Sequence, residues 1–351
     1  MMADGLRKTL IATGSDDNVI VLRKSALAEI SSIIGRDEAN IIRTLPHIAR
    51  STDTRPLVSS EVVVVINLTY NEGGFGNVTV RGISPEGLQL RPQVKLMAGR
   101  MFQWGSREII VGSSIAKRFR DASIGSKIKF GGDEWTIVGM ISSEGSGFDS
   151  ELWGDVDQLA EAFNRPVFST IIVRLDNANS FEEFRNSFRT DIRLQYLDVK
   201  REKVFYDEQS EDMAMFIRVL GLFVTMIFSA GAMIGAMITM YAAVSNRTVE
   251  IGTLRALGFK RRNILLAFFV ESIFIAITGG CLGLIFASGL QFLQLSMINF
   301  SSFAELAFRF ALSPAIAISS LIFSLIMGIV GGFLPAVRAS RLNIVNALRS
   351  S

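Results

Sequence analysis

The sequence predicts a membrane protein in which an α-helical transmembrane bundle is joined to an α+β domain outside the membrane. The first observation is hydropathy: the mean is +0.37, yet residues 1–210 have an ordinary soluble composition and the apolar excess follows Met213. The second is a set of three long charge-free stretches in that apolar part. The third is an alternation of strand-like and helix-like runs across residues 14–205, which is typical of an α+β domain.

Each charge-free stretch is longer than the roughly 20 apolar residues that a spanning helix needs. Soluble cores rarely contain even one such run, so the alternative of three buried core helices is disfavoured. The stretches run from Arg218 to Arg247, from Arg262 to Glu305 with Glu271 as the only interruption, and from Arg309 to Arg338.

The loops between these stretches set the orientation. Residues 247–262 hold five basic residues against the single acid Glu250, and residues 338–351 hold three basic residues and no acid. By the positive-inside rule both segments are cytoplasmic, so residues 1–210 lie outside a bacterial cytoplasmic (inner) membrane. The basic residues are Arg247, Arg255, Lys260, Arg261 and Arg262 in the loop, and Arg338, Arg341 and Arg349 in the tail.

A domain of this size outside the membrane needs a signal that exports it. Residues 1–8 lack the apolar core of a signal peptide. We therefore expect one more transmembrane helix to precede Met1, which would bring the number of spans to four. A misplaced start codon is one explanation for its absence. A native reading frame without an apolar segment upstream would refute this expectation. Leu6, Leu10 and Ile11 fall on one helical face, so residues 1–13 are interpreted as the outer stalk end of that helix.

The remaining chain divides into segments on the same reasoning. They are an extracytoplasmic α+β domain at 14–205, a stalk and transmembrane helix at 206–246, a cytoplasmic loop at 247–262, transmembrane helices at 263–294 and 312–337 joined by an outer loop at 295–311, and a cytoplasmic tail at 338–351.

Each predicted span carries a Gly-x-x-x-Gly step, which lets helix backbones approach closely in lipid. Three such steps favour a tight bundle or a dimer. The pairs are Gly231/Gly235, Gly279/Gly283 and Gly328/Gly332.

Glu271 lies about two turns beyond Arg262 in the second span. It is interpreted as an interfacial carboxylate near the inner leaflet. The alternative is an inward-facing carboxylate that pairs across helices, because a buried charge in a membrane needs a partner. A proton relay is disfavoured, since no second acid or histidine lies in any span.

Val- and Ile-rich runs in the outer domain predict strands, and amphipathic runs between them predict helices. Gly131-Gly132-Asp133 has the composition of a hairpin turn. The sequence leaves open whether the domain has two lobes. The predicted strands are Asn18–Lys24, Val62–Leu68, Val78–Ile83, Glu108–Gly112, Lys127–Phe130, Glu134–Ile141 and Thr170–Leu175, and the predicted helices are Ser114–Phe119, Val156–Phe163 and Phe181–Phe188.

Three segments of the outer domain allow more than one interpretation. Asn71–Gly76 is a Gly-rich tip, and a hairpin loop is favoured over a phosphate cradle because no helix follows it. Phe148, Leu152 and Trp153 form either an exposed patch for a partner or, more commonly, part of the core. Val199–Asp212 is charged and is interpreted as an extended approach followed by a stalk that continues the first span outward.

Composition and motif content argue against several function classes. The net charge of +3 is small, which argues against a nucleic-acid binder. The single Cys281 excludes an intrachain disulfide, and the single His47 lacks partners at metal-ligand spacing. Zinc motifs, a nucleophile elbow and a phosphate-binding loop are absent from the sequence, so we expect no metal, no catalytic residue, no cofactor and no ATPase activity in this chain.

The most specific segment is the cytoplasmic loop, which reads NRTVEIGTLRALGF from Asn246 to Phe259. It resembles the coupling loop of the FtsX-like, MacB-type family of ABC transporter permeases, whose pattern is R-x-x-E-I-G-x-L-R-A-x-G. The matching residues are Arg247, Glu250, Ile251, Gly252, Leu254, Arg255, Ala256 and Gly258.

The resemblance extends over nearly the whole chain. Leu334–Leu342 with Ala347–Arg349 is similar to the family's C-terminal signature, and Val111–Ala116, Ile124-Gly125 and Trp135–Gly139 are similar to its extracytoplasmic core. The chain departs from the family in one respect. The family has four spans, with the outer domain between the first two, and only the last three are visible here.

The residues of the loop fit a docking role independently of the resemblance. A helix that begins near Thr248 would place Glu250 in its first turn, where a carboxylate suits the helix dipole, and Gly258 is placed to end it. One apolar edge could insert into a groove on a cytoplasmic partner, with arginines at the rim. The alternative is an ordinary basic loop that only sets topology. The edge residues are Ile251, Leu254 and Leu257, and the rim residues are Arg247 and Arg255.

The resemblance implies mechanotransmission. Two permease copies would pair, as a homodimer or with a related chain, and bind two separate ABC ATPase subunits that hold ATP and Mg. Motion of the coupling loops would be carried through the lipid-embedded helices to the outer domains. The cargo would be a lipoprotein, peptide, amphiphile or antibiotic handled on the outer side, with a periplasmic adaptor as a further candidate partner.

Two other functions stay open on the sequence. The first is a mechanotransmitting scaffold that activates an extracytoplasmic cell-wall hydrolase without moving cargo. The second is a membrane-anchored sensor or enzyme, which is disfavoured because no catalytic residues cluster and no cytoplasmic output domain is visible.

Overall fold

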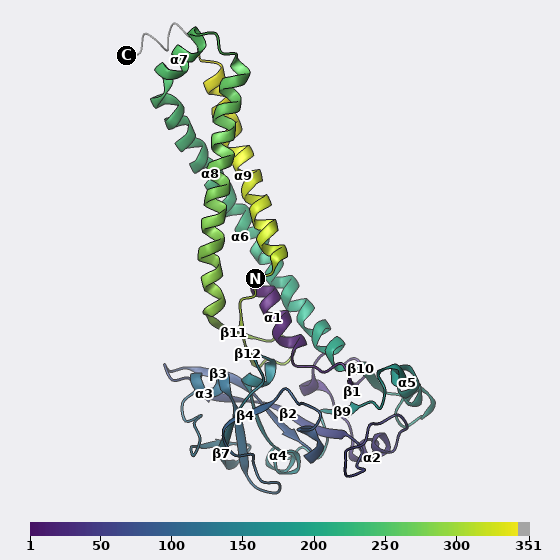
Figure 1. Ribbon diagram of the computed structural model, residues 1–351. Coiled ribbons are helices and arrows are strands. Elements are labelled where there is room, and N and C mark those ends of the chain that lie inside the picture. Colours follow the sequence, from purple (N-terminus) through teal and green to yellow (C-terminus); the bar gives the residue numbers. More distant parts are fainter. Residues whose placement is uncertain (343–351) are drawn as a thin grey trace. The chain divides into compact units, whose positions relative to one another are not determined.

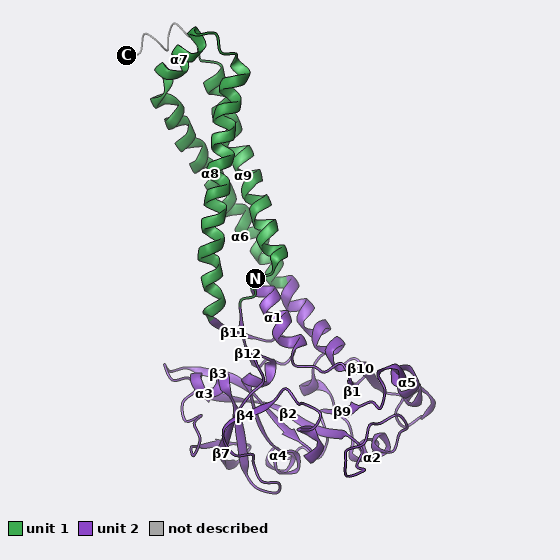
Figure 2. Cartoon of the chain, in the orientation of Figure 1, with its two compact units in different colours: residues 1, 216–293, 310–351 green, residues 2–215, 294–309 purple. Residues whose placement is uncertain are grey.

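The computed structural model describes residues 1–342, which form two compact units (Figures 1 and 2). The short segment between the last two spans belongs to the outer unit. The outer unit consists of Met2–Met215 and Gln294–Arg309, and the membrane unit consists of Met1, Phe216–Leu293 and the described residues from Phe310 on. The Ala347–Arg349 part of the C-terminal signature lies outside the described residues.

Ten strands of the outer unit form one mixed sheet. They are β1 (Asn18–Arg23), β2 (Val58–Thr69), β3 (Phe75–Ile83), β4 (Lys95–Gly99), β5 (Glu108–Gly112), β6 (Lys127–Phe130), β7 (Asp133–Ser142), β8 (Glu151–Asp155), β9 (Thr170–Arg174) and β10 (Leu197–Arg201). The order is β10-β1-β9-β2-β3-β8-β5-β7-β4, and β6 pairs with β7. The β3–β8 and β5–β7 pairs are parallel.

Strand β2 joins the two halves of this sheet. Its first residues, Val58–Glu61, pair antiparallel with β9, and the following residues, Val62–Thr69, pair antiparallel with β3. The β2–β3 turn contains Gly73 and Gly74, which both have positive φ, so the hairpin interpretation of this tip is confirmed. The two halves therefore share one continuous strand.

Buried residues of the sheet belong to two hydrophobic cores, to which the helices of the outer unit also contribute. Successive residues of a strand face opposite sides. In β8, Leu152 accordingly joins the main core, and Trp153 joins a smaller second core with Phe148. These three residues are fully buried, so the core interpretation is confirmed and the exposed-patch alternative is wrong. The helices are α1 (Met2–Ile11), η1 (Glu29–Ser31), α2 (Arg36–Arg43), η2 (Pro85–Gly87), α3 (Ser113–Arg118), η3 (Gly147–Ser150), α4 (Val156–Ala162), η4 (Ala178–Ser180) and α5 (Phe181–Thr190).

Every strand and helix predicted in the outer domain is present, with ends shifted by a few residues. The interpretation of Val199–Asp212 as an extended approach followed by a stalk is confirmed, because β10 ends at Arg201 and α6 (Glu202–Asn246) begins at the next residue. The outer segment at 295–311 contains a hairpin of β11 (Gln294–Ile298) and β12 (Glu305–Arg309), which the sequence did not predict.

The membrane unit contains α7 (Thr248–Ala256), α8 (Arg261–Gly289), η5 (Leu290–Phe292) and α9 (Pro314–Ser340), with most of α6. Within residues 1–342, three helices are long and apolar enough to cross a membrane, which are α6, α8 with η5, and α9. The first turn of α9 shows why the helix begins there. Ser313 Oγ accepts a hydrogen bond from the Ile316 N–H at 3.3 Å, and Pro314 follows the cap.

Small residues let α8 and α9 pack closely. A side chain at Gly328 would collide with Ala276, and one at Gly332 would collide with Ser272. A side chain at Gly280, which follows the predicted Gly279, would collide with Ser324 of α9. The other four predicted glycines face open space in a single chain, so their role in pairing stays a prediction. They are Gly231, Gly235, Gly279 and Gly283.

Candidate functional site

Helix α7 forms where the coupling loop is predicted. Glu250 lies in its first turn, where the free N–H groups and the helix dipole favour a carboxylate. At the other end Gly258 has φ +98° and donates to the Arg255 carbonyl at 3.2 Å, while the Phe259 N–H donates to the Leu254 carbonyl at 3.1 Å. This pair of bonds is a Schellman motif, so Gly258 ends α7 as predicted.

The face of α7 differs in one respect from the prediction. Ile251 is 2% exposed and packs inside the membrane unit, so its assignment to a partner-facing edge is wrong. Leu254 and Leu257 are exposed, and Val249 and Phe259 are exposed beside them. We call these four residues the α7 apolar edge. The core that holds Ile251 is made by Met240 and Val244 of α6, Ile264 and Phe268 of α8, and Ala336 and Ala339 of α9.

Charged residues around α7 link it to α8. The Arg247 guanidinium donates from Nη1 to both carboxylate oxygens of Glu271 at 3.2 Å. Glu271 therefore pairs with the residue that precedes α7, and its side chain is 34% exposed, which is compatible with both interpretations of this carboxylate. Glu250 is exposed, and Arg255 is partly buried with an Nε that has no hydrogen-bond partner in residues 1–342.

The outer unit contains a buried group of charged side chains that the sequence did not predict; we call it the Arg81 network. Arg81 of β3 is almost fully buried and donates to three carboxylates. Arg91, also fully buried, donates to both oxygens of Glu61 at 2.5 and 2.9 Å. The bonds from Arg81 go to Glu29 at 2.7 and 2.8 Å, to Glu151 at 2.8 Å twice, and to Glu61 at 2.9 Å.

Pairing decides the charge state of this network. Burial alone would raise the pKa of Glu61, but the charges of Arg91 and Arg81 and their hydrogen bonds outweigh it and lower the pKa. Burial acts to lower the pKa of Arg81, but the carboxylates of Glu151 and Glu29 raise it well above its ordinary value. Glu61 and Arg81 are therefore held in their charged forms by their partners, and the stability of the network depends on every partner being present.

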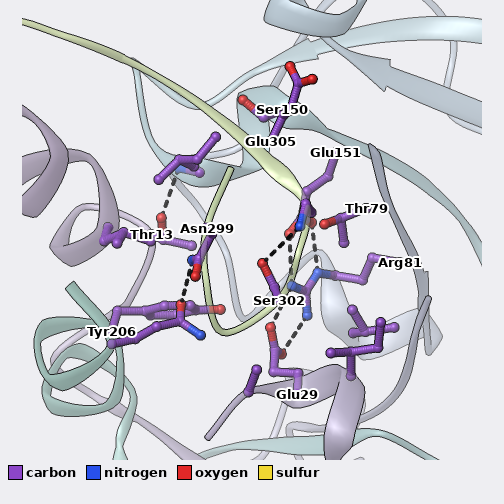
Figure 3. A pocket seen from close by; sticks show the side chains of 18 residues that line it. Thr13, Glu29, Thr79, Arg81, Ser150, Glu151, Tyr206, Asn299, Ser302 and Glu305 are labelled. Atoms are coloured by element: carbon purple, nitrogen blue, oxygen red, sulfur yellow. Dashed lines mark hydrogen bonds and ion pairs between the residues drawn. The ribbon is translucent and has the colours of Figure 1, made fainter. Parts of the chain in front are cut away.

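A small polar cavity of 60 Å³ lies beside the network (Figure 3). Asn299 and Ser302 of the β11–β12 hairpin line it, together with Glu29 and Glu151 of the network and Tyr206 of α6. The Tyr206 hydroxyl is buried, and no hydrogen-bond partner for it exists in the described part of the chain. Polar and apolar side chains both line this cavity, so it can hold water molecules, but it is far smaller than the roughly 300 Å³ of a drug-sized ligand pocket.

The first residues of α6 are fixed within the outer unit. Glu202 is fully buried, and its Oε2 accepts from the Ser15 N–H at 2.9 Å and from Asn18 Nδ2 at 3.0 Å. One turn later Asp207 accepts two bonds from the Arg7 guanidinium of α1 at 2.7 and 2.9 Å. The start of α6 is therefore held by both β1 and α1.

The lone residues noted in the sequence lie apart from these features. His47 is half-buried with Nε2 3.2 Å from a Glu183 oxygen, and Cys281 is exposed on α8. Within residues 1–342 no group of three His, Cys, Asp or Glu residues could hold a metal ion. The candidate functional features are therefore the α7 loop, the Arg81 network and the cavity.

The sequence did contain a signal for the network. Arg81 interrupts the Val-rich run of β3, and Glu61 precedes the Val-rich run of β2. A charge inside a buried strand needs a partner, so these two positions could have been matched. The partner residues Glu29 and Glu151 lie in a short helix and a short strand that the sequence analysis did not predict.

Comparison with known families matches both units. The profile of the MacB-like periplasmic core domain matches residues 1–191, and the profile of the FtsX-like permease C-terminal domain matches residues 222–344. Together they cover most of the chain.

Individual relatives agree with these matches. The macrolide export ATP-binding/permease protein MacB of Bdellovibrio bacteriovorus is 25% identical over 335 residues, which cover 85% of this chain and 49% of that protein. An uncharacterised ABC transporter permease of Bacillus subtilis, YknZ, is 25% identical over 290 residues, which cover 78% of this chain and 70% of that protein. The chain thus spans about half the length of the MacB relative.

Solved structures of outer domains align with part of the chain. The periplasmic region of MacB from Actinobacillus actinomycetemcomitans aligns with a TM-score of 0.43 and 11% identity over 59% of this chain and 98% of that one. The two family profiles, which match consecutive parts of the chain, show that it belongs to the FtsX-like, MacB-type family of ABC transporter permeases.

Proposed function

We propose that the chain is a permease subunit that transmits ATP-driven motion from a separate cytoplasmic ATPase to its outer unit. The observation that carries this proposal is the anchoring of α7. Ile251 of α7 is buried in a core to which α6, α8 and α9 all contribute. A displacement imposed on α7 is therefore passed to all three spanning helices at once, because a close-packed core transmits strain.

The exposed side of α7 suits a partner protein. The α7 apolar edge presents Leu254 and Leu257 at 40% and 74% exposure. An apolar helix edge of this kind fits a hydrophobic groove. We assign that groove to an ABC ATPase subunit, which would bind ATP and Mg, and place Glu250 and Arg255 at the rim of the contact.

Motion of α6 would be passed to the outer unit where the first residues of this helix are bonded to that unit. Glu202 and Asp207 at the start of this helix are held by hydrogen bonds from Asn18 and Arg7 of the outer unit. The four open glycines of α6 and α8 provide flat surfaces on which a second permease copy could pack within lipid. We therefore infer a working assembly of two permease chains and two ATPase chains.

The proposed activity is export or extraction of a lipoprotein, peptide, amphiphile or antibiotic. The relatives named as macrolide export proteins favour an amphiphile or antibiotic. The cavity beside the Arg81 network is too small for such a cargo, so we infer that cargo is handled on the surface of the outer unit, with a periplasmic adaptor as a candidate partner. The rival function is activation of a cell-wall hydrolase, which would require a hydrolase bound to the outer unit.

The test is co-purification with the ATPase encoded beside this chain. The chain is expressed from its full native reading frame, solubilised in detergent and isolated with and without Arg255→Glu or Glu250→Arg. Lys260→Glu is the matched control, because it changes a charge of the same loop outside α7. We expect the wild type and the control to retain the ATPase and both α7 variants to lose it.

The alternative outcomes are distinct. If the α7 variants bind the ATPase and support transport like the wild type, the role assigned to this loop is wrong. If the wild type binds no ATPase, the transporter proposal fails, and a function that depends on a partner of the outer unit is favoured instead.

A further inference from the structure

The β11–β12 hairpin lies between α8 and α9 in the chain, yet it is part of the outer unit. Its tethers are short: only Leu293 separates η5 from β11, and only residues 310–313 separate β12 from α9. Short tethers transmit displacement better than long flexible ones, because they have little slack to absorb it. The contacts between this hairpin and the rest of the outer unit therefore determine whether displacement of α8 and α9 reaches that unit.

One side of the hairpin is held by a group that we call the Glu305 clasp, made by Tyr70, Arg118 and Glu305. The Glu305 carboxylate accepts a hydrogen bond from the Tyr70 hydroxyl and forms an ion pair with Arg118 Nη2. Glu305 is 8% exposed, so this pair is largely shielded from water. The Arg118 guanidinium also lies over the ring of Tyr70 at 5.5 Å.

The surrounding backbone accommodates the clasp. Gly76 of β3 lies directly beneath it, where an added methyl group would be 2.5 Å from the Glu305 carboxylate and 2.6 Å from the Tyr70 hydroxyl. The ring of Tyr70 stacks on Phe119 with centroids 4.7 Å apart, which fixes its orientation. Every member of the clasp is thus positioned by packing.

Further polar bonds join the hairpin to the same part of the sheet. Arg118 donates to Ser296 Oγ at 2.7 Å, and Asn77 Nδ2 donates to the Phe303 carbonyl at 2.8 Å. The partners Ser114 and Arg118 lie on α3, and Asn77 lies on β3. The remaining bonds are from Gln294 Nε2 to Ser114 Oγ at 2.6 Å and from the Ala307 N–H to Ser150 Oγ at 3.0 Å.

The cavity beside the Arg81 network also borders the hairpin, and Glu305 itself is one of its lining residues (Figure 3). Asn299 and Ser302 of the hairpin line this cavity, so space for water replaces close packing there. Leu306 and Phe308 of β12 are buried, which keeps the hairpin folded against the outer unit without the clasp. The clasp therefore adds to the bonds that fix the hairpin, and we expect its removal to leave the fold in place.

We propose that the Glu305 clasp is a second mechanical attachment, by which displacement of α8 and α9 reaches α3 and the β2–β3 turn independently of α6. This inference rests on the proposed mechanotransmission function. Arg118 and Tyr70 act as positioning residues, because they hold Glu305. Without the clasp, the hairpin would move with α8 and α9 while α3 and the β2–β3 turn stayed behind.

Amide hydrogen exchange of the full chain assembled with its ATPase tests this inference. Exchange is compared between the ADP state and the ATP-plus-vanadate state for peptides covering Tyr70–Phe75 and Ser113–Phe119. In the wild type we expect both peptides to change with nucleotide. Arg118→Ala should accelerate their exchange by about tenfold, as the loss of a partly buried charged partner predicts, and should abolish the difference between nucleotide states.

Other variants separate transmission from simple loosening. Gly76→Ala should act like Arg118→Ala, because it displaces the clasp without removing a charge. The Arg118→Glu/Glu305→Arg double variant should restore part of the nucleotide-dependent difference. The matched control is Arg100→Ala, which removes an outer-unit ion pair with Glu108 that does not touch the hairpin.

Each result has a defined meaning. If Arg118→Ala keeps the nucleotide-dependent difference, or the wild-type difference appears elsewhere in the outer unit but not in these two peptides, the clasp proposal is overturned. If the wild-type outer unit shows no nucleotide-dependent difference although the ATPase is bound, the mechanotransmission function fails, and the clasp proposal fails with it.

Discussion

Replacement of Arg81 by methionine would break the buried network of the outer unit at its centre. The substitution keeps an apolar chain of similar length and removes the guanidinium that bonds Glu29, Glu61 and Glu151. Glu61 retains Arg91, and Glu151 retains the Trp153 indole N–H at 2.7 Å. Glu29 and Glu151 lose their arginine and are left as buried charges without a counterion.

The expected loss of stability follows from burial. Removal of one partner from a buried ion pair costs roughly 3–5 kcal/mol, because the remaining charge is desolvated and unpaired. A loss of 1 kcal/mol lowers the unfolding midpoint of a domain of about 150–250 residues by roughly 2–4 °C. The outer unit of Arg81→Met should therefore unfold roughly 6–20 °C below the wild type.

Intrinsic tryptophan fluorescence measures this transition in the intact chain. Trp104, Trp135 and Trp153 are the chain's three tryptophans, and all of them lie in the outer unit. The control is Arg100→Met, which removes an ion pair whose arginine is half exposed. Exposed pairs contribute about 0–1 kcal/mol, so the control should shift the midpoint by a few degrees at most.

Acid provides a second check on the same variant. The unpaired carboxylates of Arg81→Met can take up protons, which removes the buried charge, so the difference from the wild type should shrink as pH falls. Equal midpoints for Arg81→Met and the control would refute the network's role in stability. A deficit that did not change with pH would show that lost packing, and not unpaired charge, is the cause.

Three further predictions follow from the structure. Gly332→Ala should destabilise the detergent-solubilised chain more than Gly279→Ala, because only the first introduces a collision, with Ser272; equal thermal inactivation of the two would contradict this. Arg247→Glu should weaken ATPase co-purification, and the added change Glu271→Arg should restore it, since the two residues bond each other; failure of rescue would assign Arg247 to the partner contact instead. The lowered pKa of Glu61 means that its contribution to stability is present above the ordinary glutamate value of about 4.3 and is lost as pH falls through the lower folded-state value, so the tryptophan-detected midpoint should fall in acid; a midpoint independent of pH would contradict this.

The membrane helices and the coupling loop could be predicted well because their signals are local. The α7 boundaries follow from a first-turn Glu250 and a terminal Gly258, both visible as single residues. The side of α7 on which Ile251 lies could not be predicted, because burial there depends on residues of α6, α8 and α9. Periodicity within nine residues does not show which neighbours will cover a helix.

Features of the outer unit that the sequence did not reveal depend on contacts between distant residues. The strands β8 and β10 are each five residues long, and they are stabilised by pairing with β3, β5 and β1, which lie far along the chain. In the sequence, Glu305 was noted only as the end of a charge-free stretch, and its bond to Tyr70 spans 235 positions. Such pairings require a three-dimensional arrangement that no local pattern encodes.

The two-part composition of the outer unit has a consequence for biogenesis. Its sheet is complete by Arg201, but the hairpin that closes over it is made from Gln294–Arg309, after α6 and α8 have been synthesised. The surface that receives Leu306 and Phe308 must therefore stay uncovered until both helices have been inserted and the hairpin has been translocated. The outer unit is thus complete only in chains whose membrane helices have been inserted. A chaperone or protease outside the membrane could distinguish unfinished chains by this uncovered surface.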